Sequence, residues 1–306
     1  MSDFSDTVPL WPFMVMGVLG GVALLVWVSI PAVRTRYTRR MAQEQGLELD
    51  ERGLSVMAPY FARRMRLTSL GLITVCGAVL VGAALDIPLP FEGTEFWVAG
   101  MWAFIPLITV GGGIGTVVSA LRWPRTSSGT TTLGRLVPPT RADVVSPAEE
   151  RVLHIVVALG VVLPALVLAT GLGDGRPEAI AALVSGVLAA LSLLAWRTAA
   201  DRVLRRRPIS GDERSLVWSD ALRSDAVRFG MPVPAAFAAS AYALVLGTVA
   251  AALESSGSRF GGVLLTFGVL VIILGFLGVT INQLVHHPSR RWQQRLHPAL
   301  SEGGPA

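Results

Sequence analysis

The chain has 306 residues, of which 52% are hydrophobic and 15% are charged, and its formal net charge is +5. All 26 basic residues are arginine, so no lysine can form a Schiff base and a retinal protein is excluded. The chain has one cysteine, Cys76, and a single cysteine excludes a disulfide framework and a cysteine metal site. The absence of lysine, together with abundant alanine and glycine, is typical of a GC-rich bacterial source.

Seven apolar segments are each long enough to cross a bilayer as a helix. They predict an all-α integral membrane protein, a seven-transmembrane-helix bundle built as one polytopic domain over residues 1–306, in a bacterial plasma (inner) membrane. The expected spans cover about residues 10–33, 67–86, 96–121, 152–172, 178–197, 235–253 and 261–285. A polar C-terminal tail over residues 288–306 follows the last span.

Arginine is distributed unevenly between the two ends of these spans. The segments after spans one, three, five and seven contain 8, 5, 8 and 3 arginines, so 24 of the 26 lie on one side and only Arg176 and Arg259 lie on the other. Basic residues stay in the cytoplasm, so the N-terminus is expected outside and the C-terminus in the cytoplasm. Asp3 and Asp6 precede the first span without a basic residue, which is the wrong charge order for a cleaved signal peptide. The first span is therefore expected to remain as an anchor.

Pairs of glycines four residues apart occur in two of the expected spans. Gly17 and Gly21 lie in the first span, and Gly111 and Gly115 lie in the third. Small residues at this spacing let two helices approach closely, so helix packing is expected at both pairs. Packing inside the bundle and an interface between subunits are the two interpretations.

Two capping signals mark helix starts on the arginine-rich side. Ser146, Pro147 and Glu149 combine an N-cap, a first-turn proline and an acidic third position, so the fourth helix is expected to begin one turn before its span. Ser210 and Glu213 have the same capping-box spacing and predict a second helix before span six.

The helix after Ser210 is expected to be amphipathic. Its apolar side carries Trp218, Leu222 and Phe229, and Gly230, followed by two prolines, ends it. Its polar side carries Asp220, Arg223, Ser224 and Arg228. We predict an interfacial helix that lies on the cytoplasmic face of the membrane, or a docking surface for a cytoplasmic partner. The predicted fold thus includes short amphipathic interfacial helices on that face.

Arginine clusters on the same side predict contacts with lipids. The clusters are Arg34 to Arg40, Arg63 to Arg66, and the compact group Arg205, Arg206 and Arg207 just before this helix. Guanidinium groups close to the surface attract anionic headgroups, so membrane lipids are expected partners. Fixing the topology is the other role open to these residues. A nucleic-acid partner is not expected, because no basic domain with interleaved aromatic residues is present.

Two inner segments resemble each other. Residues 50–66 and 212–228 share five identities over seventeen positions in an ungapped register, and each segment leads into an apolar hairpin. Either membrane-flanking composition explains the match, or the chain carries a duplicated unit of a juxtamembrane helix plus a helical hairpin.

The spans contain no charge that has to lie at mid-membrane, whereas ion transport and proton relays normally require one. Thr109, Thr116 and Tyr242 are the candidates for lining a path, with helix packing as the alternative.

A metal site can be drawn from four inner residues, but the sequence has no HExxH spacing, phosphate loop or nucleophile elbow. These residues are Glu150, His154, His286 and His287. No catalytic residue, cofactor or metal ligand is therefore expected. The sequence favours a non-enzymatic subunit or scaffold that presents cytoplasmic-face helices to lipids or to a cytoplasmic or membrane partner subunit. The alternative is a transporter or flippase for an apolar or lipid-like substrate, and an intramembrane enzyme rests only on the inner histidines.

Overall fold

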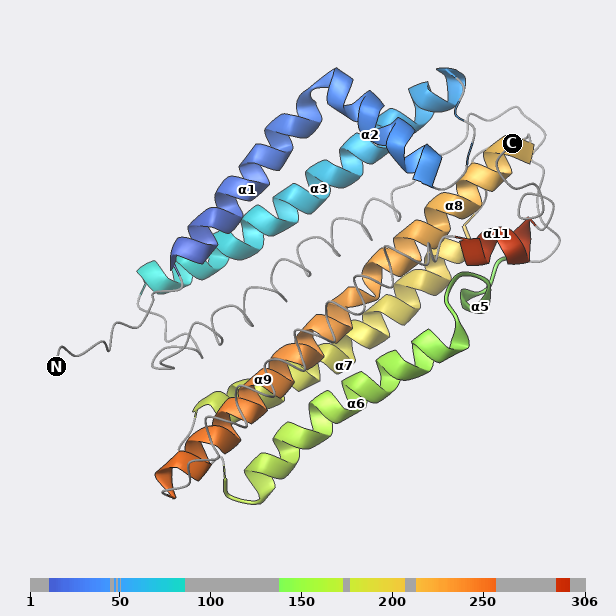
Figure 1. Ribbon diagram of the computed structural model, residues 1–306. Coiled ribbons are helices and arrows are strands. Elements are labelled where there is room, and N and C mark those ends of the chain that lie inside the picture. Colours follow the sequence, from blue (N-terminus) through green and yellow to red (C-terminus); the bar gives the residue numbers. More distant parts are fainter. Residues whose placement is uncertain are drawn as a thin grey trace.

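The computed structural model describes residues 11–44, 47, 49, 51–85, 138–172, 177–206, 213–256 and 290–297. The regular structure of these residues is entirely α-helical (Figure 1). The helices are α1 (Trp11–Ser29), α2 (Pro31–Glu44), α3 (Glu51–Ala84), α5 (Arg141–Val144), α6 (Pro147–Ala169), α7 (Pro177–Leu204), α8 (Glu213–Gly230), α9 (Pro232–Ser255) and α11 (Arg290–Leu296). The expected spans 96–121 and 261–285 lie outside the described residues, as do Gly111, Gly115 and Arg207.

Several of these helices fit a multi-pass membrane protein. Four stretches are long and apolar enough to cross a bilayer, namely Met57–Gly82, Pro147–Ala169, Glu178–Leu204 and Leu216–Leu253. The pair Met14–Ser29 and Pro31–Gln43, bent by 92°, is a fifth if it counts as one span. Each overlaps a span expected from the sequence. The predicted all-α, multi-pass character is therefore confirmed for the described part of the chain.

The described spans form two groups. Helices α1 and α3 run side by side as an antiparallel pair, and α6, α7 and α9 pack against one another (Figure 1). Gly21 of α1 faces α3 so closely that an added Cβ would lie 2.6 Å from Ile73 Cγ1, and Gly17 is also buried. The two glycines for which the sequence predicts helix packing in the first span are thus both buried, and Gly21 lies against α3.

A closer glycine contact holds the second group together. A Cβ on Gly186 of α7 would lie 2.2 Å from the carbonyl oxygen of Gly160 in α6. Gly160 in turn faces α9, where an added Cβ would lie 3.1 Å from Ala238 Cβ. Because backbone packs directly on backbone here, the three helices approach more closely than larger side chains would allow.

Two helices extend well beyond the thickness of a bilayer. Helix α3 has 34 residues, and at 1.5 Å per residue it is about 50 Å long, against about 30 Å for a hydrocarbon core. Helices α8 and α9 follow each other in nearly the same direction, interrupted only at Met231 (Figure 1). We call the assembly of α2, α5, α8, α11 and residues 51–66 of α3 the charged head.

The break between α8 and α9 has a local cause. Pro232 has no N–H group, so it cannot continue the hydrogen bonds of α8. The amide of Met231 donates to the carbonyl of Arg228 at 3.1 Å, and the carbonyl of Val227 instead accepts from Trp196 Nε1 of α7 at 2.8 Å. A Cβ at Gly230 would lie 2.7 Å from Trp196 Cδ1, so a glycine leaves room for this indole.

Candidate functional site

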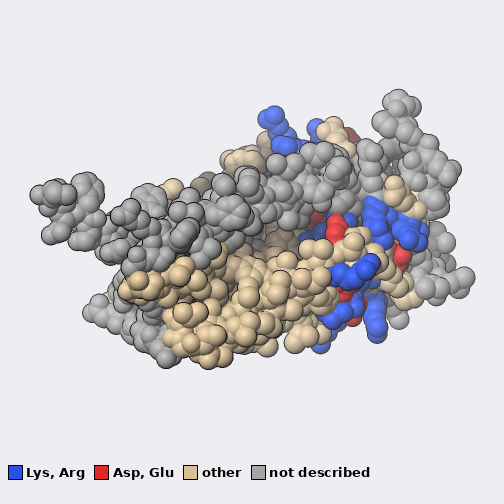
Figure 2. Space-filling model, turned by 60° about the horizontal axis from the view of Figure 1, so that its bottom comes forward, with Lys and Arg blue, Asp and Glu red and all other residues tan. Residues whose placement is uncertain are grey.

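Charged side chains gather at one end of the molecule. Figure 2 shows arginine and acidic residues together at the end formed by the charged head, while the visible described surface elsewhere is mostly uncharged. This end contains the breaks and caps of several helices. The head is therefore the place where the chain offers polar chemistry, and it is the candidate functional site.

Helix α8 lies at the centre of the head. Trp218 and Leu222 are 7% and 2% exposed and pack against Met57 and Phe61 of α3. Ala42 of α2 completes this cluster. Two of the three side chains that the sequence assigns to an interfacial or docking face therefore lie in the core of the head.

The third, Phe229, is 45% exposed and carries a cation on its face. The guanidinium carbon of Arg64 lies 4.6 Å from the centre of the Phe229 ring. Arg64 Nη1 also donates to Asp225 Oδ2, and both side chains are largely shielded from solvent. This ion pair and stacking contact join α3 to α8 at the base of the head.

The opposite side of α8 is covered by α11. Trp292 is fully buried and clusters with Val217 and Ala221 of α8. Arg291 Nε donates to the carbonyl of Ala142 at 3.2 Å, which ties α11 to α5 as well. The first part of the polar tail expected from the sequence is thus a docked helix.

The polar side of α8 is buried along with its apolar side. The side chain of Asp220 has no exposure, and its carboxylate lies 3.3 Å from Arg223 Nη1 and 3.0 Å from His297 Nε2. Arg223 also donates through Nη2 to the carbonyl of Arg206. A buried carboxylate is retained only when its charge is compensated, and here the Arg223 guanidinium does so while the His297 ring nitrogen contacts the second carboxylate oxygen.

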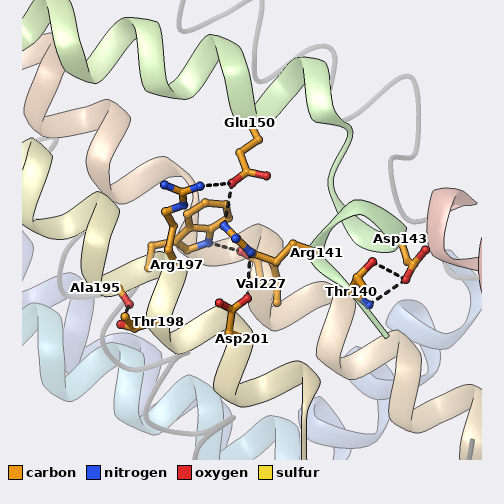
Figure 3. Close-up of polar contacts among 10 residues, drawn as sticks. Thr140, Arg141, Asp143, Glu150, Ala195, Arg197, Thr198, Asp201 and Val227 are labelled. Carbon is orange, nitrogen blue, oxygen red and sulfur yellow. Dashed lines mark hydrogen bonds and ion pairs between the residues drawn. The ribbon is translucent and has the colours of Figure 1, made fainter. Parts of the chain in front are cut away.

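A second ionic network joins α5 to α6 and α7 (Figure 3). Arg141 Nη1 lies 2.7 Å from Glu150 Oε1, and Arg141 Nε lies 2.9 Å from Asp201 Oδ1. Arg197 reaches the same oxygen of Glu150 at 3.3 Å. One arginine therefore bridges carboxylates of two helices.

The capping box expected at the start of α6 is confirmed. Ser146 Oγ accepts from the amide of Glu149 at 3.0 Å, and the Glu149 carboxylate accepts from the amide of Ser146 at 2.7 Å. Nearby, Arg228 Nη2 donates to the carbonyl of Val144 at 2.7 Å. These bonds fix the position of α6 relative to α8.

An open pocket of about 600 Å³ lies beside the Arg141 network. Its lining includes Thr140, Glu150, Asp201 and Arg205. The described residues provide no ion-pair partner for the Arg205 guanidinium, and Arg206 is exposed next to it. Two of the three arginines expected to contact headgroups are thus available at the surface.

The inner histidine group is only partly described. His154 Nδ1 lies 2.5 Å from the carbonyl oxygen of Glu150 in its own helix, and His286 and His287 lie outside the described residues. Within the described ranges, no group of three or more His, Cys, Asp or Glu residues is arranged to hold a metal ion.

The two similar inner segments both form helices that begin at corresponding residues. Helix α3 begins at Glu51 and α8 begins at Glu213, which correspond in the ungapped register. Each helix leads into a span, and the two pack against each other in the head through the Arg64 and Trp218 contacts. A duplicated unit of juxtamembrane helix and hairpin stays a prediction, and this correspondence supports it.

Replacing Trp292 by alanine is expected to release α11 from the head. Removing a fully buried aromatic side chain costs about 3–5 kcal/mol, and a helix of 7 residues is not stable without its packing partner. Trypsin should then cleave after Arg295 at least about ten times faster than in the wild type. Gln294→Ala, on the exposed side of the same helix, is the control and should leave the cleavage rate unchanged. Equal rates for both variants would show that Trp292 does not hold the helix.

Sequence reasoning did not identify three contacts, two in this site and one in the group formed by α6, α7 and α9. The Arg141 bridge and the close approach of Gly186 to Gly160 depend on residues far apart in the chain, and no local spacing indicates them. Trp292 had a usable signal, because it is a single large aromatic residue in a strongly polar segment.

Comparison of the chain with protein-family models, with curated proteins and with solved structures gives no match.

Proposed function

We propose that the chain is a non-enzymatic subunit or scaffold of a bacterial plasma membrane. It forms a seven-helix bundle with the N-terminus outside and the C-terminus in the cytoplasm. The charged head lies on the cytoplasmic side and binds lipids and a partner subunit there. The arginine asymmetry of 24 to 2 supports this orientation, and so does the gathering of charge at one end of the molecule (Figure 2).

The observation that carries the proposal is the internal pairing of the charges in the head. Arg64 and Arg223 each bind a carboxylate of α8, and Arg141 binds the Glu150 carboxylate of α6. The head also has its own apolar core around Trp218 and Trp292. Such a region keeps its shape outside the bilayer, as a platform for binding requires.

Among the described residues, three hydroxyl groups favour the scaffold over the transporter alternative, whereas Thr109 and Thr116 lie outside the described residues. The Tyr242 hydroxyl donates to the carbonyl of Val156, which links α9 to α6. Ser240 and Thr248 donate to carbonyls of their own helix at 3.1 and 2.9 Å. Groups used in this way pack the bundle, and they are not free to bind a passing solute.

The proposal is tested by extracting the tagged full chain into lipid-retaining polymer discs and identifying co-purifying proteins by mass spectrometry. We expect a stoichiometric partner with the wild type and with Gln294→Ala. The partner should be lost with Trp292→Ala, which loosens the head but leaves the described spans unchanged. A wild-type chain recovered without any stoichiometric protein would refute the subunit role. Solute movement by the purified chain alone in liposomes would favour the transporter.

A further inference from the structure

Three arginines of α2, Arg34, Arg36 and Arg39, differ in their partners from two arginines of α3 and α8. Arg64 and Arg223 are buried and bound to carboxylates. Among the described residues, no carboxylate pairs with Arg34, Arg36 or Arg39 of α2. Three guanidinium groups on one short helix thus lack a partner within the described protein, and an anion from outside can take that place.

The direction of α2 determines the depth, relative to the bilayer, at which these guanidinium groups lie. Helix α2 is bent by 92° from α1, so it runs nearly parallel to the bilayer plane if α1 crosses the bilayer. Val26 and Trp27 of α1 are exposed, and so is Ile30 at the elbow itself. Apolar exposure ends where the arginines begin, and a tryptophan marks that boundary, as is usual at the headgroup level.

One face of α2 is fastened to α3 and the other is open. Tyr37 and Phe61 pack edge to face with ring centres 5.9 Å apart, and Thr38 is fully buried. Arg36 and Arg39 lie on the exposed side. Arg36 and Arg39 therefore point away from the bundle, whereas Arg34 lies at the edge of the face that packs on α3.

Apolar side chains surround a small pocket of about 10 Å³ in the elbow, next to this charge. Its lining includes Trp27, Val33, Arg34, Phe61 and Met65. Arg34 is half-buried beside these apolar side chains. A guanidinium next to the exposed apolar side chains Val26 and Trp27 matches an amphiphile with a phosphate group and a hydrocarbon chain.

We infer that the α1–α2 elbow is a binding site for an anionic phospholipid of the inner leaflet. The phosphate pairs with Arg34 and is supported by Arg36, and the upper part of an acyl chain lies along Trp27 and Val33. The inference rests on the proposed function for one point only, that the arginine-rich end faces the cytoplasmic leaflet. The site is separate from the pocket beside Arg205.

The test titrates the purified full chain in neutral detergent with phosphatidylglycerol or with phosphatidylcholine and counts bound lipids by native mass spectrometry. The wild type should retain phosphatidylglycerol in preference to phosphatidylcholine. Arg34→Gln should bind phosphatidylglycerol about five-fold more weakly, the effect of about one interfacial arginine. Arg34→Lys should keep most of the affinity, because the positive charge remains. Arg295→Gln removes the same charge from an exposed position on α11 and should bind like the wild type.

Several results would overturn the inference. These are equal binding of the two lipids, equal losses in Arg34→Gln and Arg295→Gln, and full displacement of the lipid by inorganic phosphate. Arg36→Gln, at an exposed position, serves as the second variant if Arg34→Gln does not elute as a single folded species. A mass doubling that Arg36→Gln abolishes would instead identify a second copy of the chain as the occupant. Lipid preference without a partner protein in the polymer discs would support the elbow site and refute the subunit role.

Discussion

Replacing Gly186 by alanine is expected to lower the free energy of unfolding by about 3 kcal/mol, near the upper end of overpacking effects. The added methyl group would lie 2.2 Å from the Gly160 carbonyl oxygen and 3.0 Å from its carbon. Both are backbone atoms of α6, so neither can rotate away as a side chain would. The contact is relieved only if α6 and α7 separate, which would weaken the contact of α6 with α9 as well.

The measurement is thermal unfolding in detergent, followed by the reaction of a thiol-reactive dye with Cys76. This is the only cysteine, and it is fully buried, so dye reactivity reports loss of structure. Gly247→Ala is the matched control, because no atom lies within 4 Å of a Cβ at that position of α9. It should unfold at or slightly above the wild-type temperature, since alanine favours helix over glycine. Equal unfolding temperatures for the two variants would contradict the described packing of α6 on α7.

Breaking the ion pair between α3 and α8 is the second large effect that we expect. Arg64→Met should destabilise the protein by about 3 kcal/mol, because it leaves the largely shielded Asp225 carboxylate without a partner. It also removes the cation from the face of Phe229. The double variant Arg64→Met and Asp225→Leu should recover most of this loss, since apolar replacement of both charges removes the unpaired group.

The same dye assay distinguishes this pair from a general effect of charge. Arg63→Met removes a neighbouring arginine that is exposed on α3, and its unfolding temperature should stay within about a degree of the wild type, as for most surface changes. A double variant no more stable than Arg64→Met would mean that the pair acts through something other than mutual charge compensation. A wild-type melting temperature for Arg64→Met would show that α3 and α8 are not held together at this point.

Local chemistry allowed much of the helical framework to be predicted. The capping box at Ser146 and the end of α8 at Gly230 depend on residues adjacent in the chain, and both predictions are confirmed. The five described apolar helical stretches overlap expected spans, because hydropathy over about twenty residues is a property of composition alone. The seven-span count and the orientation stay predictions, supported by the arginine distribution.

The candidate site was predicted less completely. The amphipathic pattern of α8 identified Trp218 and Leu222 as a common apolar face, and both lie in one cluster. The pattern did not indicate that Asp220 and Arg223 on the other face are buried too. Asp220 contacts His297, which directly follows α11, and Arg223 donates to the carbonyl of Arg206 after α7. No helical periodicity reports which distant segment covers a polar face.

The sequence by itself determined that the described part of this protein is helical, that several of its helices are apolar enough to cross a membrane, and that its arginines are concentrated in polar segments between apolar ones. These are one-dimensional properties, set by hydropathy, capping residues and the order of charges along the chain. Tertiary structure decided which charges are neutralised and which stay available. Arg64 and Arg141 are bound because carboxylates of other helices fold against them, whereas Arg36 and Arg39 are exposed because Tyr37 and Thr38 hold the other face of α2 against α3. The physical reason is that a guanidinium takes its partner from whatever the fold brings within about 4 Å, which sequence spacing does not record.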